Sequence, residues 1–453
     1  MTLDKFFNAN SIAIIGVSRD PNKVGHVIFR NFIDGGYSGR LFVINPNIES
    51  ILNYHSYPSV LDIEESIELA IVAVPAELVP RVLEECGRKK IHNIIIVSAG
   101  FKEVGNMRLQ RKLEAVIKKH KLSVIGPNAL GVFDAYSKID SLFLPRYRMT
   151  RPKEGVISFV CQSGAVGSSI VDLATSEGHG FAKFISYGND IDVDESDLIE
   201  YLGNDEKTKI ICLYIEAVKN GRKFLEACRK VSRKKPIIAI KGGVTEAGAK
   251  AALSHTGSLA GSADVYFGAF KQAGVIRAET LEDMFDYAKM LEKCIKPKGG
   301  RLQVITNGGG YGILAVDEAA KDGVEMAQLG RETVKGLRKQ LSPIINVGNP
   351  LDLAGDATSG MYKTCIDAFM KDKNVDVLLV IVLVQTPLIA TDIIDVLVEA
   401  NDLKKKPLVV VSAGGEFTEV MRKNLEANGI PTYTFPEDAV KAVKHLVEYY
   451  NTL

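Results

Sequence analysis

Short runs of apolar, often β-branched residues alternate with longer amphipathic segments along almost the whole chain. Residues 11–16, for example, read Ser-Ile-Ala-Ile-Ile-Gly, whereas residues 107–120 place apolar side chains three and four positions apart. Strands that are separated by helices pair in parallel, and a parallel sheet needs helices on its faces. The pattern therefore predicts an α/β fold built from parallel sheets.

The length predicts more than one domain. A chain of 453 residues exceeds what one hydrophobic core supports, and we expect about three domains. We predict a Rossmann-like domain at 1–135 and two flavodoxin-like domains at 150–295 and 300–453, because each of the latter begins with a strand that enters a glycine-rich turn. An irregular connection containing Arg and Pro occupies 136–154, and a Lys-Pro-Lys-Gly-Gly linker occupies 296–300.

The periodicity also predicts individual elements. Strands are expected at 11–16, 40–45, 69–74, 93–98 and 123–126 in the first domain, at 155–161, 184–186, 210–215 and 236–241 in the second, and at 302–305, 375–382, 407–411 and 432–435 in the third. Helices are expected, among others, at 78–89, 107–120, 281–294 and 437–450.

Composition excludes several classes of function. The 56 basic and 55 acidic residues are well mixed and leave a net charge of +1, so neither nucleic acid nor an anionic membrane is expected as a partner. The six cysteines form no CxxC and no zinc-type spacing. There is no signal-peptide pattern, and no run reaches the ~18 to 20 apolar residues of a membrane span. We expect a cytoplasmic protein.

A first anion-binding turn follows the strand at 11–16. The run from Gly16 to Gly25 is rich in small residues and leads into a helix from about Val24. Backbone amides at such a turn approach phosphate, and the helix N-terminus favours negative charge. The run is not GxGxxG, and Asn45 occupies the position where a nicotinamide enzyme carries a ribose-binding acid. NAD is therefore disfavoured, and another ligand that contains a nucleotide is preferred.

Three other predicted strands of the first domain end at turns that point to the same crevice: Val74-Pro75, Ser98-Ala99-Gly-Phe101 and Gly126-Pro-Asn128. Ligands bind at the carboxyl ends of the strands in open parallel sheets. Each turn taken alone could serve chain reversal only. Together they predict a cofactor site at one edge of the sheet.

The second domain opens on a strand that runs into Cys-Gln162-Ser163-Gly164-Ala and then into a helix. The first amides of a helix have no partner within it, so this turn is a candidate cradle for phosphate or for an acyl phosphate. Ser163 as a hydrolase nucleophile is disfavoured, because the nucleophile-elbow sequence GxSxG is absent.

His255 lies among small residues in the run 250–262. A neutral imidazole accepts a phosphoryl group near pH 7 and passes it on, although a lone histidine in such a run can also be an ordinary polar loop residue. Glu216 ends a predicted strand and could orient the imidazole, but the sequence does not place the two in contact. The chain has no GxxxxGK[ST] motif, so a phosphohistidine here implies a partner that binds the nucleotide.

These motifs carry a family resemblance that extends over essentially all of the chain. They are IGVSR (15–19), INP (44–46), SAGF (98–101), GPN (126–128), CQSG (161–164), YIE (214–216), KGG (241–243), SHTGS (254–258), TNGGG (306–310) and GNP (348–350). In this order the chain resembles the α subunits of ADP-forming acetyl-CoA synthetases, within the superfamily of acyl-CoA synthetases that form nucleoside diphosphates and that includes succinyl-CoA synthetase.

The resemblance implies a role for each site. His255 would be the phosphorylated residue and Glu216 its orienting carboxylate. The phosphate-binding residues would be Gln162, Ser163, Gly164 and Ser258. Coenzyme A or acetyl-CoA would be bound by Gly16, Ser18, Arg19, Lys23, Pro46, Val74, Ser98, Ala99 and Asn128. Val17, Val160, Gln162 and Val166 are interpreted as contacts of the acyl group.

The resemblance also implies a reaction and a partner: acyl-CoA, ADP and phosphate would be converted to a carboxylate, CoA and ATP. No ATP-grasp region is recognised in the sequence, so ADP or ATP with Mg²⁺ would bind mainly to a separate ATP-grasp β subunit, in an α2β2 heterotetramer, and this chain would hold no metal. The third domain favours the acetate-type arrangement over the succinate type. The alternative is a non-catalytic regulatory protein that binds CoA or a nucleotide on the same folds.

Overall fold

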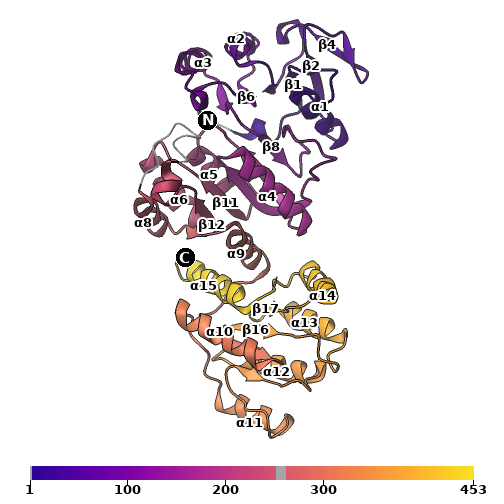
Figure 1. Ribbon diagram of the computed structural model, residues 1–453, viewed down its shortest axis with the longest axis vertical. Helices are drawn as coiled ribbons and strands as arrows, with labels where there is room; N and C mark the ends of the chain where they lie inside the picture. Colours follow the sequence, from indigo (N-terminus) through magenta and orange to yellow (C-terminus); the bar gives the residue numbers. More distant parts are fainter. Residues whose placement is uncertain (1–2, 251–261, 453) are drawn as a thin grey trace. The chain divides into compact units, whose positions relative to one another are not determined.

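The computed structural model describes residues 3–250 and 262–452. The chain divides into two compact units, Met1–Glu279 and Thr280–Leu453. In the described residues the first unit contains two β-sheets and the second unit contains one (Figure 1). All strand pairs are parallel except β3 with β4 and β8 with β10. The predicted α/β class is confirmed.

The first sheet has the strand order β3-β4-β2-β1-β5-β6-β7. Without β3, this is the 3-2-1-4-5-6 order of a Rossmann fold. Its elements are β1 (Ser11–Ile15), α1 (Val24–Asp34), β2 (Arg40–Ile44), β3 (Ser50–Ile51), β4 (Tyr54–Tyr57), β5 (Leu69–Val72), α2 (Val79–Arg88), β6 (Asn93–Ile96), α3 (Met107–His120) and β7 (Ser123–Ile125), with short 3₁₀ helices at Asp4–Phe6, Val60–Asp62, Ala76–Leu78 and Lys102–Val104.

Both faces of this sheet are covered, because successive buried side chains of a strand point to opposite faces. On β1, Ala13 belongs to the apolar cluster that includes Leu83 of α2 and Leu113 of α3. Ile14 belongs to the cluster that includes Phe29 of α1. Figure 1 shows α2 and α3 beside one another, away from α1. This alternation explains why the strands read as continuous apolar runs.

The second sheet has the order β13-β12-β11-β9-β10-β8. Strands β9 to β13 follow the flavodoxin order 2-1-3-4-5. The elements are β8 (Gly131–Asp134), β9 (Glu154–Cys161), α4 (Gly164–Ser176), β10 (Phe181–Ser186), α5 (Glu195–Asn204), β11 (Ile210–Ile215), α6 (Gly221–Ser232), β12 (Ile237–Lys241), α8 (Ala263–Ala273) and β13 (Ile276–Arg277). Strand β8 follows the Rossmann strands directly but pairs with β10, so this segment ties the two sheets of the first unit together.

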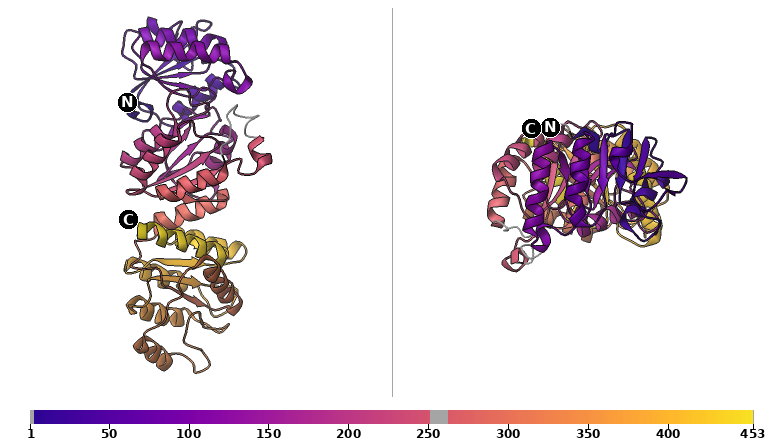
Figure 2. Two further views of the ribbon diagram at one scale, coloured as in Figure 1. Left: turned by 90° about the vertical axis from the view of Figure 1, so that its left-hand side faces the viewer. Right: turned by 90° about the horizontal axis from the view of Figure 1, so that it is seen from above.

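The third sheet has the order β15-β14-β16-β17-β18, again the flavodoxin order. Figure 2 shows helices on both sides of its strands. The elements are β14 (Leu302–Thr306), α10 (Gly309–Asp322), α11 (Arg331–Gln340), β15 (Leu351–Asp352), α12 (Ser359–Lys371), β16 (Val377–Ile381), α13 (Asp392–Asp402), β17 (Leu408–Val411), α14 (Glu416–Ala427), β18 (Thr432–Tyr433) and α15 (Pro436–Thr452).

Helix α9 (Leu281–Lys293) belongs to the second compact unit. The Tyr433 hydroxyl donates to the carbonyl of Asp286 (2.8 Å), and the Lys293 ammonium donates to the carbonyl of Glu426 (2.9 Å). The sequence pattern assigned this helix to the end of the preceding domain. Periodicity shows that a helix has an apolar face, but it does not show which sheet that face contacts.

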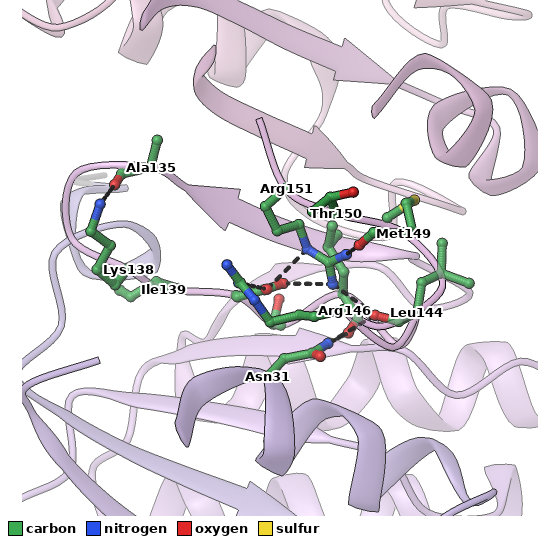
Figure 3. A network of polar contacts seen from close by, with 12 residues as sticks. Asn31, Ala135, Lys138, Ile139, Leu144, Arg146, Met149, Thr150 and Arg151 are labelled. Carbon is green, nitrogen blue, oxygen red and sulfur yellow. Dashed lines mark hydrogen bonds and ion pairs between the residues drawn. The ribbon is translucent and has the colours of Figure 1, made fainter. Parts of the chain in front are cut away.

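The connection between β8 and β9 is held by a buried ionic network (Figure 3). The Asp140 carboxylate accepts from Arg151 Nε (2.9 Å) and from Arg146 Nη1 (2.7 Å). The side chains of Asp140 and Arg151 are each 1% exposed. Asn31 of α1 donates to the carbonyls of Leu142 (2.6 Å) and Leu144 (3.0 Å). The network therefore holds in place an irregular segment that lies between β8 and β9 and has no ladder of strand hydrogen bonds of its own.

We predict that Asp140→Ala destabilises the first unit by about 3 kcal/mol or more, because it leaves the Arg151 guanidinium buried without its counter-ion. Urea unfolding followed by circular dichroism measures this change. The exposed i,i+4 pair Arg222–Glu226 offers a control, and Glu226→Ala should leave the unfolding midpoint in place. Equal midpoints for the two variants would contradict the role of the network.

Candidate functional site

A cavity of about 560 Å³ lies in the first unit. It is bounded by the residues that follow β5 and β6, by the first turn of α4, and by the residues that follow β8 and β10. Seven residues predicted for the site line it: Val74, Ser98, Ala99, Asn128, Gln162, Ser163 and Gly164. The structure therefore joins the predicted cofactor turns of the first sheet to the predicted phosphate turn of the second.

Hydrogen bonds hold the cofactor turns of the first sheet together. The Ser98 hydroxyl donates to the carbonyl of Val74 (2.6 Å), and the backbone N–H of Asn128 donates to the carbonyl of Ser98 (2.9 Å). Asn128 has a φ of 59°, a left-handed conformation that asparagine tolerates better than most residues. Carboxyl ends of neighbouring parallel strands meet at one edge, and this brings the three turns together.

The turn between β1 and α1 needs glycine at two positions where other backbone segments pass very close to it. Gly16 has a φ of +99°, and a Cβ there would lie 2.3 Å from the carbonyl oxygen of Ala73. A Cβ on Gly25 would lie 2.1 Å from the carbonyl oxygen of Gly16. Helix α1 begins after Lys23 without a side-chain cap, so its first amides remain suited to an anionic ligand.

The other residues predicted for the cofactor lie near this turn but do not line the cavity. Arg19 donates from Nε (3.1 Å) and Nη2 (3.0 Å) to the carbonyl of Ser50. The carbonyl of Ser18 is bonded to Nδ1 of His26 (2.7 Å), a contact that the sequence did not indicate. Lys23 and Pro46 are exposed. These residues follow β1 and β2, so they share the ligand-binding edge of the sheet with the cavity.

The phosphate turn at the start of α4 has a side-chain cap, and it also faces the cavity. The Ser163 hydroxyl accepts from the amide of Val166 (3.4 Å). The amides of Gly164 and Ala165 belong to the first turn of α4, where a helix supplies no acceptor of its own. The nearest neighbour of a Cβ on Gly164 would be the Cβ of Leu130, 3.7 Å away. The turn can therefore receive an anion from the cavity.

Gln162 links this turn to the end of β11. Its side-chain oxygen accepts from the backbone N–H groups of Glu216 (2.7 Å) and Ala217 (3.0 Å), and its backbone N–H donates to the carbonyl of Tyr214 (3.1 Å). Gln162 thus fixes the backbone that carries the Glu216 carboxylate relative to the start of α4. The sequence marked Gln162 as a phosphate ligand and did not indicate this link.

Glu216 lies in a buried polar group. It is 7% exposed, and Lys241 at the end of β12 is 5% exposed. Burial lowers the pKa of the Lys241 ammonium, and the Glu216 carboxylate opposes that shift. Burial and the same carboxylate raise the pKa of Tyr214 to about 12. His255 and Ser258 lie outside the described residues, so their contacts with this group remain predictions.

The structure adds cavity residues that the sequence analysis missed. Lys102 follows β6, and Asn189 and Asp190 follow β10, so the strand-end rule applied to these positions would have found them. The backbone N–H of Asn189 donates to the carbonyl of Pro127 (2.9 Å). Phe143 comes from the irregular connection, where no periodic pattern marks it.

Val17, Val160 and Val166, the three valines interpreted as contacts of the acyl group, do not line the cavity. Val17 and Val160 are 0% and 1% exposed and belong to the apolar core. Their apolar character reflects packing beneath the turns. The apolar lining comes instead from Leu130, Phe143 and Leu144.

Asp190 is a titratable group of the cavity. Burial raises its pKa to about 6, although the Lys219 ammonium, with which it forms an ion pair, acts in the opposite direction. Lys102 also lowers this pKa, and Asp194 raises it. The carboxyl group therefore becomes charged as the pH rises through about 6.

The three sheets correspond to three known domain families. Residues 10–135 match the CoA binding domain, residues 154–291 match the succinyl-CoA ligase like flavodoxin domain, and residues 302–450 match the Ligase-CoA domain. The fold and these matches place the chain in the class of α/β proteins built from CoA-binding and CoA-ligase domains.

Whole-chain relatives narrow this class. The chain is 39% identical over 454 residues to the α subunit of acetate–CoA ligase (ADP-forming) II of Pyrococcus furiosus, covering 98% of this chain and 97% of that one. It matches the structure of "dinucleotide forming Acetyl-coenzyme A synthetase 1" of Candidatus Korarchaeum cryptofilum in complex with phosphate and ADP, with a TM-score of 0.94, 34% identity and coverage of 99% and 97%. The chain belongs to the family of ADP-forming acetate–CoA ligases, and within it resembles the α subunits.

Some relatives are longer. The chain is 42% identical to the ADP-forming acetate–CoA ligase of Methanocaldococcus jannaschii. The match extends over 443 residues, which are 97% of this chain but only 62% of that protein.

In the described part of the chain, no helix is long and apolar enough to cross a membrane. Nor does that part group three or more His, Cys, Asp or Glu side chains so that they could hold a metal ion.

We predict that Asp190→Asn changes the pH dependence of phosphate binding. Ionised Asp190 adds a negative charge to the cavity, so the ratio of the phosphate Kd of the wild type to that of the variant should rise as the pH increases from 5 to 7. About 1 kcal/mol of repulsion corresponds to about fivefold. Isothermal titration calorimetry measures both Kd values at each pH. Because phosphate itself titrates equally in the two measurements, its contribution cancels in the ratio.

The exposed Glu206→Gln is the control for this experiment, and its ratio to the wild type should stay constant over the same pH range. A ratio for Asp190→Asn that is equally flat would contradict the placement of a titrating carboxyl group in the cavity that binds the phosphate.

Proposed function

We propose that this chain is the α subunit of an ADP-forming acyl-CoA synthetase that interconverts acyl-CoA, ADP and phosphate with a carboxylate, CoA and ATP. One observation carries the proposal. A single cavity is lined both by the strand ends of the CoA-binding domain, at Ser98 and Ala99, and by the first turn of α4, at Ser163 and Gly164. A thioester and a phosphate can therefore meet in it.

Coenzyme A would bind along the carboxyl edge of the first sheet. Its phosphates suit the uncapped start of α1 beside Arg19 and Lys23, where amides and cations favour negative charge. Gly16, Ser18 and Pro46 shape the same edge. The pantetheine arm would then enter the cavity past Val74 and Asn128, and bring the thioester toward α4.

Phosphate would bind at the turn formed by Gln162, Ser163 and Gly164. The helix amides there stabilise negative charge on the phosphoryl oxygens and position one oxygen for attack. That oxygen bonds to the thioester carbonyl carbon, the carbon–sulfur bond breaks, and the phosphate proton passes to the CoA sulfur. The products are an acyl phosphate and CoA.

His255 would then accept the phosphoryl group. The imidazole nitrogen bonds to phosphorus as the bond between phosphorus and the carboxylate oxygen breaks, which releases the carboxylate and one proton. Glu216 would accept a hydrogen bond from the other ring nitrogen and so select the tautomer that attacks. Ser258 would contribute a hydroxyl to the phosphoryl oxygens.

The last transfer, to ADP, would require a partner. The chain spans 62% of the Methanocaldococcus jannaschii relative, and we propose that an ATP-grasp β subunit supplies the remaining function. It would bind ADP or ATP with Mg²⁺, in an α2β2 assembly. The relative of known structure is described in complex with phosphate and ADP, which fits an enzyme that uses both ligands.

We predict that this chain becomes phosphorylated on His255 when it is incubated with acetyl-CoA and phosphate, and that His255→Ala abolishes the modification while CoA affinity remains within about twofold of the wild type. Intact-mass and peptide analysis under alkaline conditions measures the phosphorylation, because phosphohistidine is labile in acid. Calorimetry measures the CoA affinity.

His55→Ala is the matched control, since His55 is exposed on β4 and should leave phosphorylation unchanged. If the wild type stays unmodified, ATP, Mg²⁺ and the partner subunit are added to drive the reverse transfer. A bare His255 under both conditions would overturn the proposal in favour of a regulatory CoA-binding protein.

A further inference from the structure

We propose that Lys241 is a positioning residue for Glu216, and that its buried ammonium keeps the Glu216 carboxylate in the charged form that orients the attacking imidazole. This inference rests on the proposed function and adds a residue to the phosphoryl-transfer step. Lys241 ends β12 and is 5% exposed, and Glu216 follows β11 and is 7% exposed. The sequence analysis gave Lys241 no role in the site.

Strand pairing brings the two residues together. Lys241 is the register partner of Ile215 on the neighbouring strand, and Glu216 is the next residue along the chain. The backbone N–H of Gly242 donates to the carbonyl of Ile215 (2.8 Å), so the pairing continues past the end of β12. A Cβ on Gly242 would lie 3.5 Å from Cγ of Glu216. The Glu216 side chain therefore passes over the residue that follows Lys241.

The ammonium is held by groups other than a carboxylate. Its Nζ donates to the carbonyl of Gly242 and lies 4.8 Å from the centre of the Tyr266 ring. In the described part of the chain Lys241 forms no ion pair, and Glu216 acts on it by charge alone. The Tyr266 hydroxyl accepts from the backbone N–H of Val218 (2.9 Å). Tyr266 thus fixes both the ammonium and the segment that follows Glu216.

Packing alone does not require an ammonium at this position. A buried charge without an ion pair is unfavourable, and an apolar side chain of similar length, such as methionine, would fill the space without that cost. A group that destabilises the fold locally is expected where function needs it. The charge of Lys241 is therefore the property to explain.

Lys241 is the base in the buried group around Glu216. Among the described residues, the charge of Glu216 contributes, after burial, to the raised pKa of three acidic side chains that come from β9, from the residues after β10 and from β11: Cys161, Tyr187 and Tyr214. These groups are neutral when protonated and do not compensate a carboxylate. Burial lowers the pKa of Lys241, and Glu216 opposes that shift. The same attraction favours the charged form of Glu216.

Other cations near β12 are engaged elsewhere. Arg277 of β13 is exposed and pairs with Glu279 (3.1 Å), and Lys219 pairs with Asp190. The buried residues of α6 include one titratable group, Cys228, and the charged residues of α8 are exposed. Among the described residues, charge compensation at the end of β11 therefore comes from the end of β12.

The sign of the pH effect follows from this arrangement. A protonated carboxyl group no longer offers the imidazole N–H the strong charge-assisted bond that a carboxylate gives. Removing the nearby cation makes the charged carboxylate less favourable. Neutral replacements of Lys241 should therefore lose activity mainly at low pH and regain it at high pH.

The experiment uses the full chain assembled with its ATP-grasp partner and measures kcat/KM for acetyl-CoA, from CoA release that depends on phosphate and ADP, at about pH 5 to 8. For Lys241→Met and Lys241→Gln, the ratio of variant to wild type should fall about tenfold toward low pH, which corresponds to about one pH unit. Groups that titrate equally in both enzymes cancel in this ratio. Lys241→Arg keeps the charge, and its ratio should change by less than about twofold.

Lys289→Met is the matched control. Lys289 also lies over a tyrosine ring, 4.4 Å from the centre of the Tyr433 ring, and its side chain is 12% exposed. It belongs to α9 in the second compact unit, and its ratio should stay constant with pH. Two neutral replacements of Lys241 keep the test independent of either one, because glutamine retains a donor for the Gly242 carbonyl and methionine matches the apolar length. Thermal unfolding followed by circular dichroism checks that each variant is folded.

A ratio that stays flat with pH in both neutral variants would overturn the inference, and an equal loss of activity at every pH would assign Lys241 a structural role instead. The same fall toward low pH in Lys241→Arg would also overturn it, because the charge is retained there. A wild-type assembly that releases no CoA with phosphate and ADP at any pH would instead overturn the proposed function on which the inference rests.

Discussion

The site depends on the side-chain oxygen of Gln162, which accepts hydrogen bonds from the amides of Glu216 and Ala217. Parallel strands bring their carboxyl ends to one edge, but they do not fix the loops beyond them. Gln162 supplies that constraint. It fixes the backbone that carries the Glu216 carboxylate relative to the amides at the start of α4, as the proposed catalytic geometry would require.

A second set of contacts joins the cofactor edge to the phosphate turn. Asn189 donates to Pro127 across the two sheets of the first unit, β8 pairs with β10, and Asn31 of α1 holds the connection that carries Phe143. Because Asn31 bonds helix α1 to the connection that carries Phe143, these two parts of the structure share one support. The proposed cleavage of a thioester would need both ligands in register, and this arrangement would favour it.

Much of this architecture is predictable from the sequence, because long parallel strands and their glycine turns follow local rules. The turns at Ser98 and Ser163 were located in this way. The sequence analysis missed the two-residue edge strands β3, β13 and β15, because two residues carry no periodicity, whereas the equally short β18 lies in a longer predicted run at 432–435. Phe143 escaped because its place in the cavity depends on Asp140 and Arg151, whose pairing within an irregular segment no spacing rule encodes.

The most direct test of the account follows an oxygen atom. If phosphate attacks the thioester and the phosphoryl group then passes to His255, a phosphate oxygen must remain in the carboxylate product. Turnover of acetyl-CoA by the assembled enzyme with ¹⁸O-labelled phosphate and ADP, followed by mass spectrometry of the acetate, measures this transfer. The account predicts acetate that carries one labelled oxygen from phosphate. Unlabelled acetate would show that another nucleophile cleaves the thioester, and would contradict it.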